Sequence, residues 1–144
     1  MKKLLAVILF VILVVGFTGV ASAAEWQLIG SEDKRDMFFD TQSFEADKAS
    51  KTYTVWLKSQ FTEDYCEKLT DTNKYEKMFL YTLTQIKIDY KNKKMQYVSS
   101  FACDIDGGIL DSFDMVSEWY SIDSGSIEER VFKKTYDYYK KHYQ

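Results

Sequence analysis

Apolar and polar residues alternate through the middle of the chain, between Lys77 and Asp104, in the pattern of a long β-hairpin. A polar turn at residues 91–94 separates its two arms. Apolar residues recur in each arm with a period of two: Ile86, Ile88, Tyr90, Met95, Tyr97, Phe101 and Cys103. This period is typical of half-buried antiparallel strands, so the hairpin is expected to form the centre of a sheet.

The alternation changes phase within the first arm of this hairpin. The apolar residues before position 84 are odd-numbered, whereas Ile86 and Ile88 are even-numbered. One inserted residue near Thr84 or Gln85, a β-bulge, would place both sets on the same side of the sheet.

Other short runs with strand character extend the expected sheet to about five to seven strands. They lie at residues 25–30, 37–40, 52–61 and 109–115 and around Trp119. In the run at 52–61, the positions that would face the core are Tyr53, Val55, Leu57 and Phe61. Trp56 and Lys58 would then lie on the opposite face. Residues 42–50 are expected to form a polar connection.

Two segments carry the signals of α-helices. Thr62 would cap a short helix at residues 62–70. Ser126 and Glu129 form a capping box, in which the Ser126 hydroxyl accepts from the Glu129 N–H and the Glu129 carboxylate reaches back. The terminal helix that follows has one apolar stripe: Val131, Phe132, Thr135, Tyr136, Tyr139 and Tyr143. This stripe should pack on an antiparallel sheet, giving one α+β domain over residues 24–144.

The first 23 residues have the features of a secretory signal peptide. Two lysines precede an apolar run from Leu4 to Val15, and Ala21-Ser22-Ala23 is a small-residue cleavage site. Cleavage there would start the mature chain at Ala24 and place it in the periplasm, on the cell surface or outside the cell. Only the signal segment would then contact the membrane, and only before cleavage. The alternative is a retained anchor, because the apolar stretch extends to Val20 and falls just short of the ~20 residues that cross a bilayer.

Charge and composition narrow the class of partner. The signal segment holds two of the 19 basic residues and none of the 22 acidic ones, so the mature net charge is 17 − 22, or −5. A mildly acidic domain without a basic stripe argues against a nucleic-acid partner. The abundant aromatic residues stand mostly at positions that face the core, where they would pack rather than bind.

Two cysteines, Cys66 and Cys103, would enter an oxidising compartment if the signal peptide operates. A disulfide between them is the favoured expectation. The alternative is two buried or separately free thiols, because cysteines pair only when their Cα atoms lie within about 7 Å of each other.

No catalytic or metal-binding motif stands out. His142 is the single histidine, and the chain offers no Cys or Ser motif to pair with it. The run from Asp104 to Gly107 resembles the start of a calcium loop, but Met115 stands at its twelfth position, where a glutamate would bind. A hairpin turn at Gly107-Gly108 is expected instead. The residues alone therefore leave the activity unassigned, and we expect no metal or other cofactor.

The side chains best placed to form a binding surface are Trp56 and the helix residue Tyr138, which lies off the apolar stripe. Trp and Tyr anchor many protein interfaces. Four lysines of the terminal helix add a modest basic surface: Lys133, Lys134, Lys140 and Lys141. The alternative for these lysines is ordinary solvation.

Short motifs follow one another in a definite order along residues 24–144. They comprise Trp26, an F-x-D element ending at Asp40, Ser43, Val55-Trp56, Ile88-Asp89 and a closing run of Trp119, Ile122, Gly125, Ser126 and Glu129. In order and spacing they resemble the surface-adhesin protein E family of small exported bacterial domains. The closing run is similar to the family signature W-x-x-I-x-P-G-S-x-x-E. Two departures are Ser124 in place of the proline and Tyr90 in place of a cysteine that the family often pairs near its C-terminus.

The resemblance implies an antiparallel sheet with a C-terminal helix and a non-enzymatic role in adhesion, since some members bind host extracellular-matrix proteins. The partners would be such matrix proteins or other envelope proteins. Two alternatives stay open: a periplasmic structural or accessory domain without a host ligand, and a small-ligand carrier with an aromatic pocket. The carrier would need an apolar cavity of about 300 Å³ or more.

Overall fold

The computed structural model of this chain describes residues 23–72, 79–114 and 116–144. The side chains of residues 69–72 and 79 also lie outside the description. All but the last residue of the expected signal peptide falls outside the described residues, and so does Met115.

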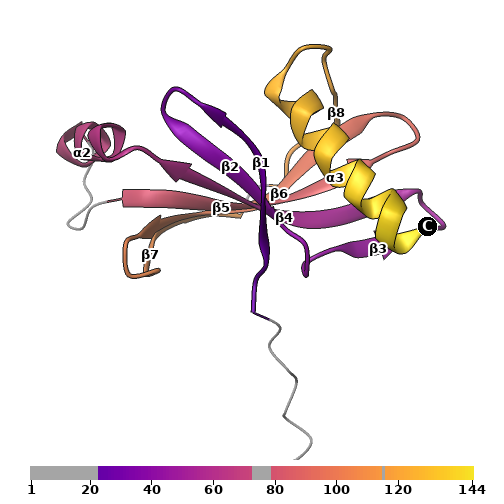
Figure 1. Cartoon of the computed structure of the whole chain (residues 1–144), viewed down its shortest axis with the longest axis horizontal. Coiled ribbons are helices and arrows are strands. Elements are labelled where there is room, and N and C mark those ends of the chain that lie inside the picture. Colours follow the sequence, from indigo (N-terminus) through magenta and orange to yellow (C-terminus); the bar gives the residue numbers. More distant parts are fainter. Residues whose placement is uncertain (1–22, 73–78, 115) are drawn as a thin grey trace, which may run out of the picture.

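The described residues form one antiparallel sheet with two helices, which confirms the predicted α+β class (Figure 1). The strands are β1 (Trp26–Glu32), β2 (Arg35–Asp40), β3 (Glu45–Asp47), β4 (Thr52–Phe61), β5 (Phe79–Asp89), β6 (Lys94–Asp104), β7 (Ile109–Phe113) and β8 (Tyr120–Ser121). The helices are α2 (Glu63–Thr72) and α3 (Ile127–Tyr143). Six strands follow the order β1-β2-β4-β5-β6-β7, while β3 pairs with β4 and β8 pairs with β6.

Both helices lie on the same side of the sheet, α2 near one end of the strands and α3 near the other (Figure 1). We call the face that they cover the inner face and the opposite one the outer face. The inner side chains of β4 and β5 alternate with outer ones and are fully buried under α3, as the sequence predicts: Tyr53, Val55, Leu57, Ile86 and Ile88. The pleat therefore sets which residues form the core.

The apolar stripe of α3 packs on this inner face. Val131, Phe132, Thr135 and Tyr139 are all buried. The rings of Tyr139 and Tyr53 stack with centroids 4.8 Å apart, and the Tyr53 hydroxyl lies 2.8 Å from the Thr135 hydroxyl. The predicted packing of an amphipathic terminal helix against the sheet is confirmed.

The predicted β-bulge lies at the expected level of the hairpin but in the other arm. Gln85 pairs with Ser99 and Ile86 pairs with Tyr97, so the unpaired extra residue is Val98 of β6. The pairing of β4 with β5 runs without any shift over its whole length. The bulge was predicted near Thr84 or Gln85 of β5, and that assignment is wrong. The irregularity that β5 does contain lies earlier, at Leu80, between the pairs Phe79–Asp104 and Tyr81–Cys103.

Because β5 keeps its phase from Tyr81 to Asp89, the apolar residues before and after Thr84 in this range lie on opposite faces of the sheet. Ile86 and Ile88 face inward, whereas Tyr81 and Leu83 face outward across from Gln60 and Lys58. The expectation that both sets share one side is therefore wrong. The change of phase in the sequence marks the place where β5 stops contributing to the core under α3.

Two core residues lie outside the predicted pattern. Phe44, in the expected polar connection at 42–50, is buried with its ring centroid 6.0 Å from that of Phe39. Ile29 of β1 is buried because the register with β2 shifts between Leu28 and Gly30. Both side chains reach the core at places where the regular strand pattern is interrupted, Phe44 between β2 and β3 and Ile29 at the register shift in β1.

The capping box at the start of α3 is present with one change of partner. The Glu129 N–H donates to the Ser126 hydroxyl at 3.1 Å, as predicted. The Glu129 carboxylate accepts from the N–H of Gly125 at 2.9 Å, one residue before the N-cap. Gly125 has a positive φ of 82°, a conformation that glycine adopts without strain. The hydrogen bond to Gly125 lowers the pKa of the Glu129 carboxyl below its ordinary value.

Replacing Glu129 with alanine should therefore lower the thermal midpoint at neutral pH. A carboxyl whose pKa is lowered by folding contributes stability above its unfolded pKa and loses that contribution as the pH falls through the folded pKa. The gap between wild type and Glu129→Ala should accordingly shrink on acidification, as followed by circular dichroism melts. Glu128→Ala is the matched control, since it removes the same charge from the same helical turn. Equal midpoints for both variants at neutral pH would contradict the assigned cap.

Candidate functional site

The residues that carry the family resemblance mostly hold the backbone at strand ends. The Asp40 carboxylate accepts from the N–H groups of Glu25 (2.9 Å) and Gln42 (3.0 Å). The Ser43 hydroxyl donates to the Asp40 carbonyl (2.9 Å) and accepts from the Trp56 N–H (3.0 Å). Together they fasten the end of β2 to the start of β1 and the middle of β4.

The later motif residues have similar structural tasks. Asp89 accepts from the N–H groups of Lys91 (3.0 Å) and Asn92 (2.9 Å) and so closes the β5–β6 turn. Ile122 is half-buried and packs on the core, while Trp119 is 37% exposed. The motif set thus describes mainly how the domain is folded, and its three tryptophans, Trp26, Trp56 and Trp119, are the members that bear on a possible binding surface.

The predicted disulfide between Cys66 and Cys103 is absent, and both cysteines are buried. Cys66 of α2 packs against Ala102 on the inner face. Cys103, the next residue along β6, consequently points to the outer face, where it is paired with Tyr81. The sheet separates the two sulfur atoms, so the prediction is wrong for a reason of strand geometry.

Burial raises the pKa of both thiols, which keeps them protonated and weakly nucleophilic at neutral pH. We expect iodoacetamide to modify neither cysteine in the folded protein and both after denaturation without reductant, as read by intact mass. If denatured protein takes up the reagent only after reduction, the cysteines are bridged and the assignment fails.

The helix residues proposed from sequence as a binding surface have mostly local partners. The side chains of Lys133 and Lys140 pair with Glu129 and Asp137 one helical turn away, each at 3.0 Å. Exposed pairs of this kind contribute little stability, but they neutralise part of the basic surface. Lys134 and Lys141 are exposed and solvated.

Tyr138 is part of the core boundary rather than an exposed anchor. Its ring centroid lies 5.5 Å from that of Phe39 and 5.3 Å from that of Phe44. The other side of its ring stacks on the exposed His142 at 4.2 Å. The prediction that Tyr138 is well exposed is corrected by these contacts, because the buried Phe44 extends the core beneath it.

The outer face of the sheet carries the largest group of aromatic side chains outside the core. A cross-strand row of paired residues joins Leu28, Phe38, Lys58, Leu83 and Phe101 across five strands. Trp26, Trp56 and Tyr81 flank this row. We call these eight residues the outer-face patch. Leu28 is 49% exposed, and the other seven are partly exposed.

Aromatic contacts order this patch. The ammonium group of Lys58 lies 4.8 Å from the ring centroid of Tyr81 and 5.9 Å from that of Trp26. Trp56 stacks on Phe101 with ring centroids 5.9 Å apart. Each cation–π contact of this kind contributes about 0.5–1 kcal/mol at an exposed site. The patch is therefore a pre-ordered aromatic surface with one positive charge at its centre.

The inner face has a small cavity of about 140 Å³ between the start of α3 and the sheet. Its floor carries the hydroxyls of Ser59, Thr82 and Thr84, and Thr84 bonds the hydroxyl of Ser100 at 2.9 Å. These hydroxyls separate the core under α3 from a smaller apolar cluster under α2. The cavity is about half the size that a carrier of small molecules needs.

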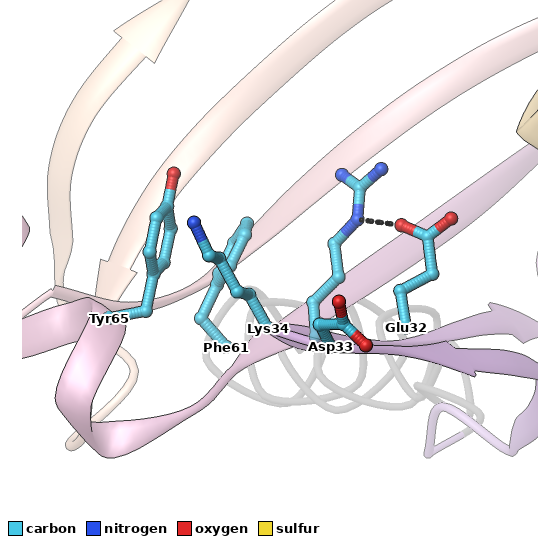
Figure 2. A pocket seen from close by; sticks show the side chains of 6 residues that line it. Glu32, Asp33, Lys34, Phe61 and Tyr65 are labelled. Atoms are coloured by element: carbon cyan, nitrogen blue, oxygen red, sulfur yellow. Dashed lines mark hydrogen bonds and ion pairs between the residues drawn. The ribbon is translucent and has the colours of Figure 1, made fainter.

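An open groove of about 560 Å³ lies between the β1–β2 turn and the start of α2 (Figure 2). The Lys34 amine stands 5.4 Å from the centroid of the Tyr65 ring, and Tyr65 stacks on Phe61. Arg35 donates to Glu32 at 3.2 Å on the other side of the groove. Two acidic and two basic side chains, Glu32, Asp33, Lys34 and Arg35, line the groove beside Phe61 and Tyr65, so it lacks the enclosed apolar lining of a small-molecule pocket.

Within the described residues, no group of three or more His, Cys, Asp or Glu side chains could hold a metal ion. The run that resembles a calcium loop folds instead as a turn. The Asp104 carboxylate accepts from the N–H groups of Asp106 (2.9 Å) and Gly108 (2.8 Å). A Cβ atom at position 108 would lie 2.8 Å from that carboxylate, so a larger residue there would have to displace the Asp104 side chain that holds the turn.

Comparisons of the chain with protein-family models, curated proteins and solved structures give no match. Neither helix in the described ranges has the length and apolar character of a membrane span. The geometry of the outer-face patch is therefore the main structural observation that bears on function.

Proposed function

We propose that this chain is an exported, non-catalytic protein of the surface-adhesin E type, which binds other proteins through the outer-face patch. One observation carries the proposal. Two helices cover the inner face of the sheet, while the outer face presents ordered aromatic side chains that no described helix covers.

The chemistry of the patch suits a protein partner. Binding hot spots are enriched in Trp, Tyr and Arg and are surrounded by apolar side chains that exclude water. Trp26, Trp56 and Tyr81 provide such anchors, and Leu28 is the exposed apolar neighbour. The side chains are already held by stacking and by Lys58, so little conformational entropy is lost on binding.

The signal-like first 23 residues and the resemblance supply the class of partner. An exported adhesin would meet host extracellular-matrix proteins or other proteins of the cell envelope. The rival is a periplasmic accessory domain, and labelling of intact cells separates the two because membrane-impermeant reagents reach only a protein on the surface.

We expect saturable binding of the purified protein to at least one member of a panel of extracellular-matrix proteins, measured by biolayer interferometry. Leu28→Glu should weaken that binding about tenfold or more, because it places a charge within the apolar patch. Gln27→Glu is the matched control, since it adds the same charge in the same strand with its side chain on the other face. Absence of saturable binding, or an equal loss in both variants, would refute the proposed surface.

A further inference from the structure

Exposed apolar side chains are concentrated in one short part of the chain. Seven large hydrophobic residues are exposed in the described ranges, and five of them lie between residues 105 and 119. These are Ile105 (69% exposed), Ile109 (64%), Phe113 (53%), Val116 (65%) and Trp119 (37%). Ile109 and Phe113 belong to β7 itself and lie on opposite faces of the sheet, because they pair with Cys103 and Ser100. Single exposed apolar residues are common, but five within fifteen residues, two of them in one strand, mark this stretch as a candidate for interaction.

The strand at the centre of this cluster is an open edge of the sheet. β7 pairs with β6 on one side and with no other strand in the described residues. Natural proteins protect such edges with lysine or proline, with other charges, with bulges or by keeping the strand short. β7, with the sequence ILDSF, has no lysine or proline; its protection consists of its length of five residues, the charge of Asp111 and a shift of register against β6.

The backbone of β7 offers hydrogen bonds on its open side. The Ser112 N–H donates to the carboxylate of its neighbour Asp111 at 2.9 Å, which marks this amide as directed away from β6. A local side chain thus satisfies a donor that an added strand would use. In β-augmentation, a backbone carbonyl of the added strand would take the place of the Asp111 carboxylate as the acceptor for this N–H.

The charge around this edge selects the partner. Residues 95–129 contain eight acidic residues and no lysine or arginine. Four of them, Asp106, Asp111, Asp114 and Glu118, stand within or next to β7 in the sequence and supply the charge of the edge. The other four lie elsewhere: Asp104 is buried and holds the β6–β7 turn, and Asp123, Glu128 and Glu129 stand at or near the start of α3. An incoming strand with positive side chains would be attracted to this surface, whereas an acidic strand would be repelled.

We propose that β7 is a docking edge for an extended, lysine- or arginine-bearing segment of a partner protein, which adds to the sheet as a further strand. Charge also argues against a second copy of this chain as the occupant. Two β7 edges would bring Asp111 and Asp114 of each copy together, and the opposite edge, β1, is flanked by Glu25 and Glu32. Ser112 of β7 pairs with Phe101, so this docking edge adjoins the outer-face patch, but the proposal does not depend on the function of the patch.

The test uses two synthetic peptides, one of alternating lysine and valine and one with glutamate in place of each lysine. Fluorescence anisotropy of labelled peptide should show binding of the lysine peptide, weakened by added salt, and no binding of the glutamate peptide. The amide NMR signals of residues 109–113 should shift on binding. Failure of the lysine peptide to bind, or equal binding of both peptides, would overturn the proposal.

Two variants locate the site. Ser112→Pro removes the outward N–H while leaving the side that pairs with β6, and it should reduce binding of the lysine peptide about tenfold or more. The double variant Asp111→Lys with Asp114→Lys should weaken binding of the lysine peptide by a similar factor and allow the glutamate peptide to bind. Asp123→Lys is the control for a charge change outside the edge. Unaltered binding in the charge-reversed protein would refute the site, and so would dimerisation of the wild type that Ser112→Pro abolishes.

Discussion

The contact between Tyr53 of β4 and the terminal helix supports the rest of the structure. Tyr53 stacks on Tyr139 and shares a hydrogen bond with Thr135, and all three side chains are buried. The Thr135 hydroxyl donates to the Val131 carbonyl, so it accepts from Tyr53. Burial raises the pKa of the Tyr53 phenol above its ordinary value, and its hydroxyl stays a donor at any physiological pH. The helix is thus bound to the sheet by stacking and by one oriented hydrogen bond.

Because α3 and α2 cover one face of the sheet, the outer face is the one that no described helix covers. The change of phase in the β5 sequence follows from this difference between the two faces. Ile86 faces the core, whereas Leu83, three residues earlier, faces outward. Hydroxyls at Ser59, Thr82 and Thr84 break the inner face into two apolar clusters and leave only a small cavity. Protein binding is therefore better supported by this architecture than the carriage of small molecules.

Sequence periodicity predicts the parts of the fold that repeat regularly. The central hairpin, the run at 52–61, the capping box and the α3 stripe all follow from patterns of two or of three to four residues. Phe44 and Ile29 lie in irregular segments, where no period exists to place them. A disulfide depends on the distance between the two cysteines, which the sequence does not supply. Alternation along β6 places Cys103 on the opposite face of the sheet from Cys66. Alternation along β4 predicts that Trp56 lies on the outer face. The packing of Tyr138 could not be predicted in this way, because it depends on the burial of Phe44, which no sequence pattern indicates.

The central claim, that α3 is bound to β4 through Tyr53, is tested most directly by a double-mutant cycle measured in urea. Thr135→Val leaves the buried Tyr53 hydroxyl without an acceptor and should cost about 1–3 kcal/mol, whereas Tyr53→Phe removes the donor and should cost about 0.5–1.5 kcal/mol. The double variant should lose less than the sum of the two, by about 1 kcal/mol. Strictly additive losses would show that the two side chains do not interact and would contradict the account.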